Sequence, residues 1–318
     1  SDHGKINGLT NLTTGVLTTG TTSKNTFEID KLKQLYGASI GAYSDLDKTY
    51  ITMSTLLPSL DKSLKLYADI IVNPAFSQEE VDRRKDQQIN GIKSSLKQPF
   101  NRIGSVMPKI LYGEGHPYAA PLNGNGSVES VSTIKRKDVV EHYKNWVMPN
   151  NATLIVVADV DASSLKASLN KSLGKWQKGT KPKKDIPEVK TSEFGVLYLM
   201  DKPEASQSMI IGGHLIDPYG SSNETFKEMA NTVYGGAFTS RLNMNLREDK
   251  HWSYGARAIV INRVGQGTII SYAGVQTDKT SESVQEMMKE LNWVVGDKPI
   301  TQEELDKVSK NAILELPG

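Results

Sequence analysis

The 318-residue sequence contains no cysteine. This absence excludes disulfide bonds, thiolate metal ligands and cysteine nucleophiles together. Histidine is also scarce. The five copies show no metal-ligand spacing among themselves: His3, His116, His142, His214 and His251. Most are expected to be ordinary surface or turn histidines, and only His251 is a weak candidate for contact with a substrate.

The charge balance and the hydropathy pattern exclude further classes of protein. The formal net charge is only +2, which does not indicate a nucleic acid or an acidic membrane surface as partner. No run of eighteen apolar residues occurs, so no membrane span is expected. A chain of this length exceeds one comfortable core, and it is predicted to form two domains of ordinary size.

An internal duplication supports two domains. The segment PAFSQEEVDRRKDQQI at 74–89 resembles KPITQEELDKVSKNAI at 298–313. In each copy a proline precedes a Ser/Thr-x-x-Glu capping box, which predicts the start of a helix. The repetition of one pattern in both halves predicts two domains of the same kind.

Each copy is preceded by the same predicted succession of helix, hairpin and helix. In the first half these are a helix at 27–36, a hairpin at 38–57 and a helix at 59–72; in the second they are helices within 223–249, a hairpin at 254–276 and a helix at 281–295. The hairpin strands alternate small or apolar with polar residues, as strands packed on one face do. The predicted fold is therefore α+β, with an antiparallel sheet under helices in each domain.

The intervening segments complete the predicted domain organisation. A helical stretch at 78–146, a strand at 153–160 and a helix at 161–173 are followed by a Lys/Pro/Gly-rich linker, and FGVLYLM at 194–200 opens the second domain as a strand. The predicted domains are 1–176 and 191–318, joined by the linker 177–190. By symmetry the first domain should have opening strands before residue 1, so the chain is interpreted as truncated at both ends.

The most informative segment is GGAFTSRLNMNLREDKHWSYG at 235–255. It predicts a short amphipathic helix with Leu242 and Leu246 on one face, followed by a strand that opens at Tyr254. Ser240 or Thr239 is available to cap the helix. A guanidinium from Arg247 and a phenol from Tyr254 could both offer hydrogen bonds to a peptide carbonyl or carboxylate. The simpler alternative is that Arg247 pairs with a neighbouring acid and that Tyr254 is a half-buried strand aromatic.

This segment resembles the Arg/Tyr signature of the pitrilysin/insulinase family of inverted-motif zinc metallopeptidases. The resemblance continues through GLTNLTTGVLTTGTT at 8–22, LYGASIGAYSDLDKTYITMSTL at 35–56, GHPYA at 115–119 and MPNNATLIVVADVD at 148–161, and so covers nearly the whole chain. Active members of that family carry HxxEH on a helix and a further glutamate ligand on a later helix. Such a helix holds zinc between two histidines, and the glutamate between them acts as general base.

None of these groups is present here. The histidine positions of the motif hold Asn11 and Gly15, the base position holds Thr14, and the later ligand position falls at about Gly91. Glycine has no ligating side chain, and threonine cannot act as a carboxylate base. No cofactor is therefore expected in this chain, and the resemblance implies that zinc is held by a partner half.

The resemblance implies a function for the chain within a larger assembly. It would be the zinc-less subunit of a heterodimer, or the C-terminal half of a fused polypeptide, opposite a half that carries HxxEH. Arg247 and Tyr254, with a weaker contribution from His251, would then bind the peptide substrate and stabilise the oxyanion formed during its hydrolysis. The alternative is an inert structural or interaction protein that resembles the core subunits of the respiratory complex. The family favours a periplasmic setting, and a cytoplasmic one stays open.

Overall fold

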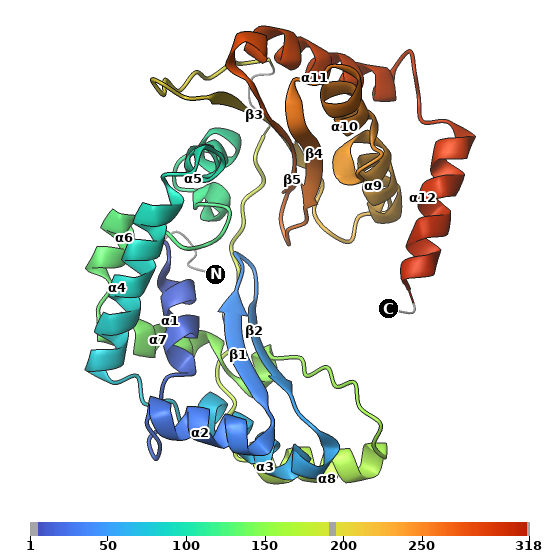
Figure 1. Ribbon diagram of the computed structural model, residues 1–318. Helices are drawn as coiled ribbons and strands as arrows, with labels where there is room; N and C mark the ends of the chain where they lie inside the picture. Colours follow the sequence, from blue (N-terminus) through green and yellow to red (C-terminus); the bar gives the residue numbers. More distant parts are fainter. Residues whose placement is uncertain (1–5, 191–194, 317–318) are drawn as a thin grey trace. The chain divides into compact units, whose positions relative to one another are not determined.

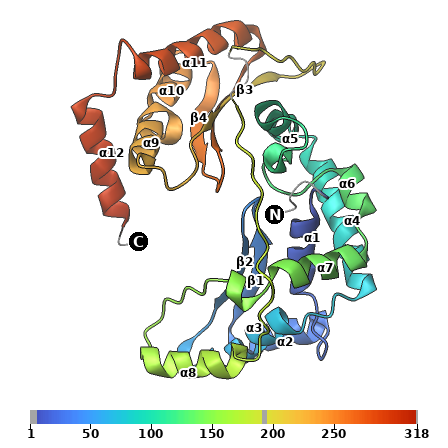
Figure 2. The same ribbon diagram turned by 180° about the vertical axis from the view of Figure 1, so that it is seen from behind.

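The computed structural model describes residues 6–190 and 195–316 of the chain. These residues form two compact units (Figures 1 and 2). Unit 1 comprises Ser1–Lys109 with Glu114–Ile186, and unit 2 comprises Ile110–Gly113 with Pro187–Gly318. The chain is an α+β protein whose sheets are antiparallel, as the sequence predicts. Among the described helices, none is both long enough and apolar enough to cross a membrane.

Unit 1 contains one hairpin among helices. Its main elements are α1 (Leu9–Leu17), α2 (Thr26–Tyr36), β1 (Ser39–Ser44), β2 (Thr49–Ser54), α3 (Leu60–Val72), α4 (Gln78–Ser95), α5 (Pro99–Tyr112), α6 (Val128–Thr133), α7 (Arg136–Trp146) and α8 (Ala162–Leu173). Short 3-10 turns lie at Leu57–Ser59, Pro117–Ala119 and Pro149–Asn151. The hairpin turns at Asp45, whose carboxylate accepts hydrogen bonds of 2.7 Å from the N–H groups of both Asp47 and Lys48. This side-chain cap fixes a tight turn and hence the register of β1 on β2.

Helix α1 lies at the centre of unit 1. Seven of its nine residues are buried, and it packs against β1, α4 and α7. It begins after Gly8, which has φ of 93°. A Cβ atom at Gly8 would lie 2.6 Å from the Asn125 carbonyl oxygen, so both the backbone angle and the space require glycine.

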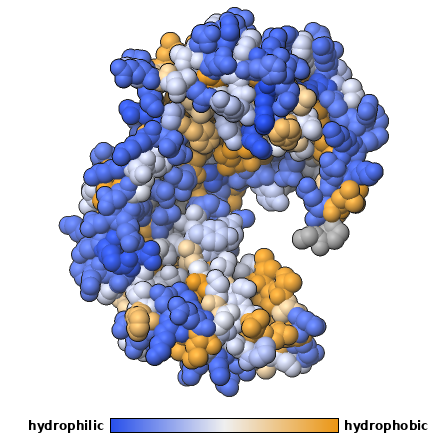
Figure 3. Space-filling model, viewed as in Figure 1, coloured by the Kyte–Doolittle hydropathy of each residue, from blue (hydrophilic) through white to orange (hydrophobic). Residues whose placement is uncertain are grey.

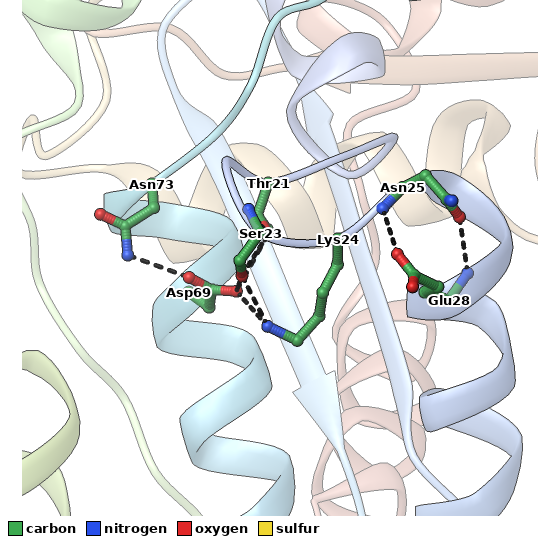
Figure 4. A network of polar contacts seen from close by, with 7 residues as sticks. All are labelled: Thr21, Ser23, Lys24, Asn25, Glu28, Asp69 and Asn73. Atoms are coloured by element: carbon green, nitrogen blue, oxygen red, sulfur yellow. Dashed lines mark hydrogen bonds and ion pairs between the residues drawn. The ribbon is translucent and has the colours of Figure 1, made fainter.

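The loop after α1 is tied to α3 by a polar network around Asp69 (Figure 4). The Asp69 carboxylate accepts hydrogen bonds from Lys24 Nζ at 2.9 Å, Thr21 Oγ1 at 3.0 Å and Asn73 Nδ2 at 2.9 Å. Burial works to raise the pKa of Asp69, but the bonds from Lys24, Asn73 and Thr21 outweigh it and hold the pKa below its ordinary value. The network holds the loop after α1 against the end of α3. Directly after it, Asn25 and Glu28 form the capping box that begins α2.

Three predictions for the chain outside the hairpins were wrong. The helical stretch expected at 78–146 is divided into α4, α5, α6 and α7, with a loop at 113–127 that contains four glycines of positive φ. The run at 153–160 is not a strand. A β-prone sequence becomes a strand only with a hydrogen-bonded neighbour, and the described residues offer this run none. Ile155 and Val157 are consequently 83% and 96% exposed.

The segment 194–200, expected to open the second domain as a strand, behaves in the same way. Phe194 lies outside the described residues. From Gly195 onward the segment is not assigned to a strand, and Leu199 is 88% exposed. Figure 3 shows that hydrophobic patches, in orange, lie among the hydrophilic surface of the molecule.

Unit 2 is a three-stranded sheet with helices. Its elements are β3 (Gln207–Ile216), α9 (Glu224–Asn231), the π-helix η4 (Thr232–Gly236), α10 (Arg241–Asn243), the π-helix η5 (Met244–Asp249), β4 (Ser253–Ile261), β5 (Gly267–Gln276), the 3-10 turn η6 (Thr277–Lys279), α11 (Thr280–Val295) and α12 (Gln302–Glu315). The strand order is β3-β5-β4, antiparallel throughout. The α9, α10 and α11 helices lie on one face of this sheet (Figures 1 and 2).

The helical layer of unit 2 lies very close to the sheet. A Cβ atom at Gly235 would lie 2.5 Å from Cβ of Ala258, so η4 can rest on β4 only because Gly235 has no side chain. The Gly235-Gly236 pair is therefore explained by close approach rather than by a turn with positive φ. Leu242 and Leu246 are fully buried on the alanines of β4 and β5.

Helix α12 is joined to α10 by an ion pair. Arg241 donates from Nε and Nη2 to the two oxygens of Glu304, at 2.7 and 2.6 Å. The Arg241 guanidinium, together with the Thr301 cap, lowers the pKa of Glu304 to about 2 although burial opposes this. The paired, ionised form of Glu304 is thus the one that the fold favours.

We expect Gly8→Ala to lower the free energy of unfolding by about 3 kcal/mol, because it adds a steric clash to an unfavourable φ. Gly113→Ala is the matched control: Gly113 has φ of 82°, but no atom lies within 4 Å of the added Cβ. It should cost only about 1 kcal/mol. Urea unfolding measures both, and equal losses would show that the contact with Asn125 does not constrain the start of α1.

The Arg241–Glu304 pair should make stability depend on pH in acid. Because the pKa of Glu304 is depressed in the fold, its contribution is fully present above the ordinary pKa of 4.5 and is lost as the pH falls toward about 2. Glu304→Gln should therefore reduce stability by about 1 kcal/mol at pH 7 and flatten its fall between pH 4.5 and 2. Exposed Glu303→Gln is the control. The free energy of unfolding of both variants is measured in urea between pH 7 and pH 2. If it depends on pH in the same way in the two variants, the Arg241–Glu304 pair does not cause the loss of stability in acid.

Candidate functional site

The residues at the family's zinc positions lie on two helices that pack together. Asn11, Thr14 and Gly15 are on α1, and Gly91 is on α4. Gln88, one turn before Gly91, donates to the Gly8 carbonyl at 3.1 Å and so joins α4 to the start of α1. The topology thus brings the four positions onto neighbouring helices.

The side chains at these positions do not fit a metal ion. The Thr14 hydroxyl donates to the Thr10 carbonyl within its own helix at 2.7 Å, and Thr13 does the same to Leu9 at 2.8 Å. A Cβ atom at Gly15 or at Gly91 would meet nothing within 4 Å beyond its chain neighbours and the backbone of its own helix. In the described part of the chain, no group of three or more His, Asp or Glu side chains is arranged to hold a metal. We therefore derive no reaction step from this chain's own helices α1 and α4.

His142, on α7, is the histidine that lies against α1. Its Nε2 is 3.1 Å from Thr10 Oγ1. The contact joins two helices and does not place the imidazole among ligand-type side chains. His116 also has a local role, because its Nδ1 accepts the Tyr118 N–H at 3.0 Å and caps the turn that follows.

The Arg/Tyr segment of unit 2 lies across η5 and β4. The expected amphipathic helix is present, but only Arg241–Asn243 is α-helical and Met244–Asp249 is a π-helix. Ser240 stands at the N-cap, yet its hydroxyl makes no capping bond. Arg247 lies on the partly exposed side of η5. Its guanidinium stacks over Phe238 at 4.8 Å and contacts the adjacent Glu248 at 3.2 Å, with 41% of each of the paired side chains exposed. A pair this exposed contributes little energy, so the guanidinium can exchange Glu248 for another acceptor.

Tyr254 is almost completely exposed. Its side chain is 88% accessible and makes no hydrogen bond to any residue that the structure describes. This exposure contradicts the half-buried strand aromatic of the simpler alternative. Tyr254 stands where the pairing of β4 with β5 is irregular, between Ser253 and Ala256, in a β-bulge. Bulges commonly redirect a side chain out of the regular ladder.

Two buried polar residues, Asn243 and Ser253, form hydrogen bonds with the backbone of this bulge. Asn243, only 4% exposed, donates to the Phe238 carbonyl at 2.7 Å and accepts the Ala256 N–H at 3.0 Å. The Ser253 hydroxyl accepts the Gly255 N–H at 3.1 Å and lies 2.8 Å from the Gly274 carbonyl oxygen. Asn243 thus joins the loop beneath Arg247 to the strand that carries Tyr254. Sequence reasoning missed both residues, although an asparagine on the apolar side of an amphipathic helix is a signal that could have found Asn243.

His251 connects the two elements. Its φ is 57°, a left-handed conformation that histidine tolerates better than most residues. Its Nδ1 lies 3.1 Å from the Arg247 carbonyl oxygen, and its own carbonyl accepts a bond from Gln276 at 3.2 Å. The exposed imidazole therefore closes the end of η5 and lies beside the backbone of Arg247.

Solved structures of similar fold include peptidases. The Pseudomonas fluorescens structure described as a peptidase M16 inactive domain superposes with a TM-score of 0.88 at 20% identity, covering 98% of this chain and 75% of that one. The periplasmic protease PqqL from Escherichia coli gives a TM-score of 0.71 at 16% identity, covering 100% of this chain and 36% of that one. The chain thus shares the fold of these two structures, and its described residues contain no group of metal ligands.

Family models match most of the sequence. Residues 133–311 match the model described as peptidase M16 inactive domain, and residues 1–114 match insulinase (peptidase family M16). The chain belongs to the M16 peptidase family. It is 22% identical over 290 residues to the uncharacterized zinc protease YmxG of Bacillus subtilis, covering 90% of this chain. Its matches span between 62% and 69% of the length of three curated relatives.

We expect Asn243→Ala to lower the free energy of unfolding by about 1 to 3 kcal/mol, because it leaves the buried Ala256 N–H without its partner and removes the bond to the Phe238 carbonyl. The matched control is Asn223→Ala: Asn223 is exposed and its side chain makes no cap. That change should stay within about 0.5 kcal/mol. Thermal unfolding of both variants checks the difference, and a neutral Asn243→Ala would show that the bulge holds itself.

Proposed function

We propose that this chain is the non-zinc-binding half of an M16 metallopeptidase assembly and that Arg247 and Tyr254 are its contribution to substrate binding and hydrolysis. The observation that carries the proposal is that, at the β4 bulge, the backbone is held by buried side chains while the Tyr254 side chain is exposed. Buried Asn243 and Ser253 fix the backbone, whereas the phenol of Tyr254 is 88% exposed with no described partner. A tyrosine held outward on a fixed backbone is suited to donate a hydrogen bond to a group that this chain does not supply.

The chemistry of the two side chains fits an acceptor that gains negative charge. A guanidinium and a phenol can both donate to the carbonyl oxygen of a peptide while that oxygen becomes an oxyanion. Besides its stacking on Phe238, the Arg247 guanidinium has the exposed Glu248 as its one ion-pair partner among the described residues, so exchanging that acceptor for a substrate costs little. His251, at the end of η5, would contact the substrate beside them.

The partner in this proposal is a homologous half that carries HxxEH, the zinc ion and the general base. The name zinc protease borne by the relatives supports zinc chemistry in the assembly. The unsuitable residues on α1 and α4 support its location elsewhere than on these helices. The region corresponding to this chain is about a third of PqqL, so in that protein it is one part of a longer polypeptide. Because PqqL is a periplasmic protease, the likeness also supports a periplasmic setting for this chain.

We expect peptide hydrolysis only when this chain is combined with the HxxEH half. In that mixture Tyr254→Phe should lower kcat by about 10²–10³-fold, because it removes one oxyanion donor, and Arg247→Ala should lower it at least as far. Tyr219→Phe is the matched control, since Tyr219 is also largely exposed, at 62%. Both halves should still co-purify with every variant.

Three outcomes of that experiment are informative. Full turnover with Tyr254→Phe and Arg247→Ala would instead establish an inert scaffold, the structural alternative that resembles respiratory-complex core subunits. Stoichiometric zinc together with turnover in the lone chain would contradict the assignment of α1 as a helix without ligands. Loss of co-purification would assign the two residues to the interface.

A further inference from the structure

Phe238 contacts the guanidinium of Arg247 in the Arg/Tyr segment of unit 2. It belongs to the turn at 237–240, between η4 and α10. The Arg247 Cζ atom lies 4.8 Å from the centre of the Phe238 ring. This distance is within the range of about 6 Å at which a cation is attracted to the face of an aromatic ring. The Phe238 side chain is 52% exposed, so its ring lies at the surface rather than in the buried core.

The backbone of the turn that carries Phe238 is held by hydrogen bonds. The Ala237 N–H donates to the Thr232 carbonyl at 3.3 Å, and the Ser240 N–H donates to the Ala237 carbonyl at 3.2 Å. The buried Asn243 amide donates to the Phe238 carbonyl at 2.7 Å. The half-exposed ring is therefore attached to a backbone that has little freedom to move.

Asn243 also joins this turn to the strand of Tyr254. Its Oδ1 accepts the N–H of Ala256, two residues after Tyr254, at 3.0 Å. A single buried amide thus bonds both to the backbone that carries Phe238 and to the backbone of the β4 bulge. When the guanidinium of Arg247 rests on Phe238, it is consequently held at a defined place relative to Tyr254.

The contact with Phe238 leaves hydrogen-bond donors of Arg247 available. A cation–π contact uses the positive charge of the guanidinium and none of its N–H groups. Its Nε atom pairs with the exposed Glu248 at 3.2 Å, and among the described residues its Nη1 and Nη2 atoms have no hydrogen-bond acceptor. An arginine side chain that is already held in place also loses less rotamer freedom when it binds a substrate.

We propose that Phe238 is a positioning residue for Arg247, whose guanidinium it holds ready to donate to the peptide substrate. The inference rests on the proposed function of Arg247 and adds to it the residue through which that side chain is oriented. The face of an aromatic ring is what the guanidinium requires at position 238. An aliphatic side chain of similar size therefore does not replace Phe238, whereas tyrosine does.

The first measurement tests the contact in the lone chain, without any peptidase activity. The chain is labelled with carbon-13 and nitrogen-15 arginine, and the δ-methylene and Nε–H signals of Arg247 are identified with Arg247→Lys. Protons over the face of an aromatic ring resonate upfield, so Phe238→Leu should move these signals downfield. Phe226→Leu is the matched control, because Phe226 on α9 is also largely exposed, at 69%, and it should leave them in place. Unchanged signals in Phe238→Leu would overturn the proposal.

The second measurement is peptide hydrolysis by this chain combined with the HxxEH half. Phe238→Leu should lower kcat by about two- to fivefold, the range of an exposed cation–π contact. The loss should be in kcat rather than in KM, because Arg247 acts as the oxyanion forms. Phe238→Tyr keeps the ring face and should restore the kcat of the unchanged chain. Phe226→Leu should leave kcat as it is.

Arg247→Ala provides the background that separates positioning from a purely structural role. In this background Phe238→Leu should have no further effect on kcat, because the guanidinium through which the ring acts is absent. An equal loss from Phe238→Leu in both backgrounds would overturn the proposal, since the ring would then act independently of Arg247. A failure of Phe238→Tyr to restore kcat would overturn it as well.

The same variants distinguish this inference from the proposed function. Lowered turnover in Arg247→Ala together with full turnover in Phe238→Leu would contradict only the positioning role of Phe238. Full turnover in Arg247→Ala would contradict the proposed function and the positioning role with it. The arginine signals of the lone chain then show separately whether the ring holds the guanidinium, because that measurement needs neither the partner half nor zinc.

Discussion

The organisation of unit 2 depends on how closely its helical layer approaches the sheet. At Gly235 the η4 backbone rests on Ala258 with no room for a Cβ atom, and alanines continue this small surface along β4 and β5. The depth of this contact fixes the level of α10 and η5 above the strands. Asn243 can then reach the Ala256 N–H in β4 from the helical layer. A larger residue at Gly235 would raise the layer and separate these partners.

The short π-helix η5 has side chains both in the interior and on the surface of unit 2. Within η5, Asn245 turns inward to Glu286 and Glu290, whereas Arg247 remains partly exposed beside Phe238. The π-helical geometry of this segment is an interruption of regular α-helix, and such interruptions are frequent at functional sites. One element thus carries both the buried Asn245 and the partly exposed Arg247.

The sequence predicted the locally determined parts of the fold. The Ser77 cap of α4, the Thr301 capping box of α12 and the alternation along β4 and β5 are all encoded within a few residues. The strands expected at 153–160 and 194–200 failed because a strand also needs a neighbour from elsewhere in the chain. The π-helices and the bulge at Tyr254 could not be predicted, since both arise from packing between elements. The family resemblance located Arg247 and Tyr254, but the buried supports Asn243 and Ser253 became visible only in three dimensions.

The residues at the family's zinc positions, on α1 and α4, differ in how much free space surrounds them. At Gly15 and Gly91 an added Cβ atom would meet no atom of another element within 4 Å, so the first atom of a side chain has room there. Thr14 is different, because it is buried, at 4% exposure, and its hydroxyl bonds back to Thr10 in its own helix. A carboxylate at Thr14 would be buried in what is now part of a packed core. Of the family's zinc-site positions, the general-base position at Thr14 is therefore the one where the present packing is least compatible with a charged side chain.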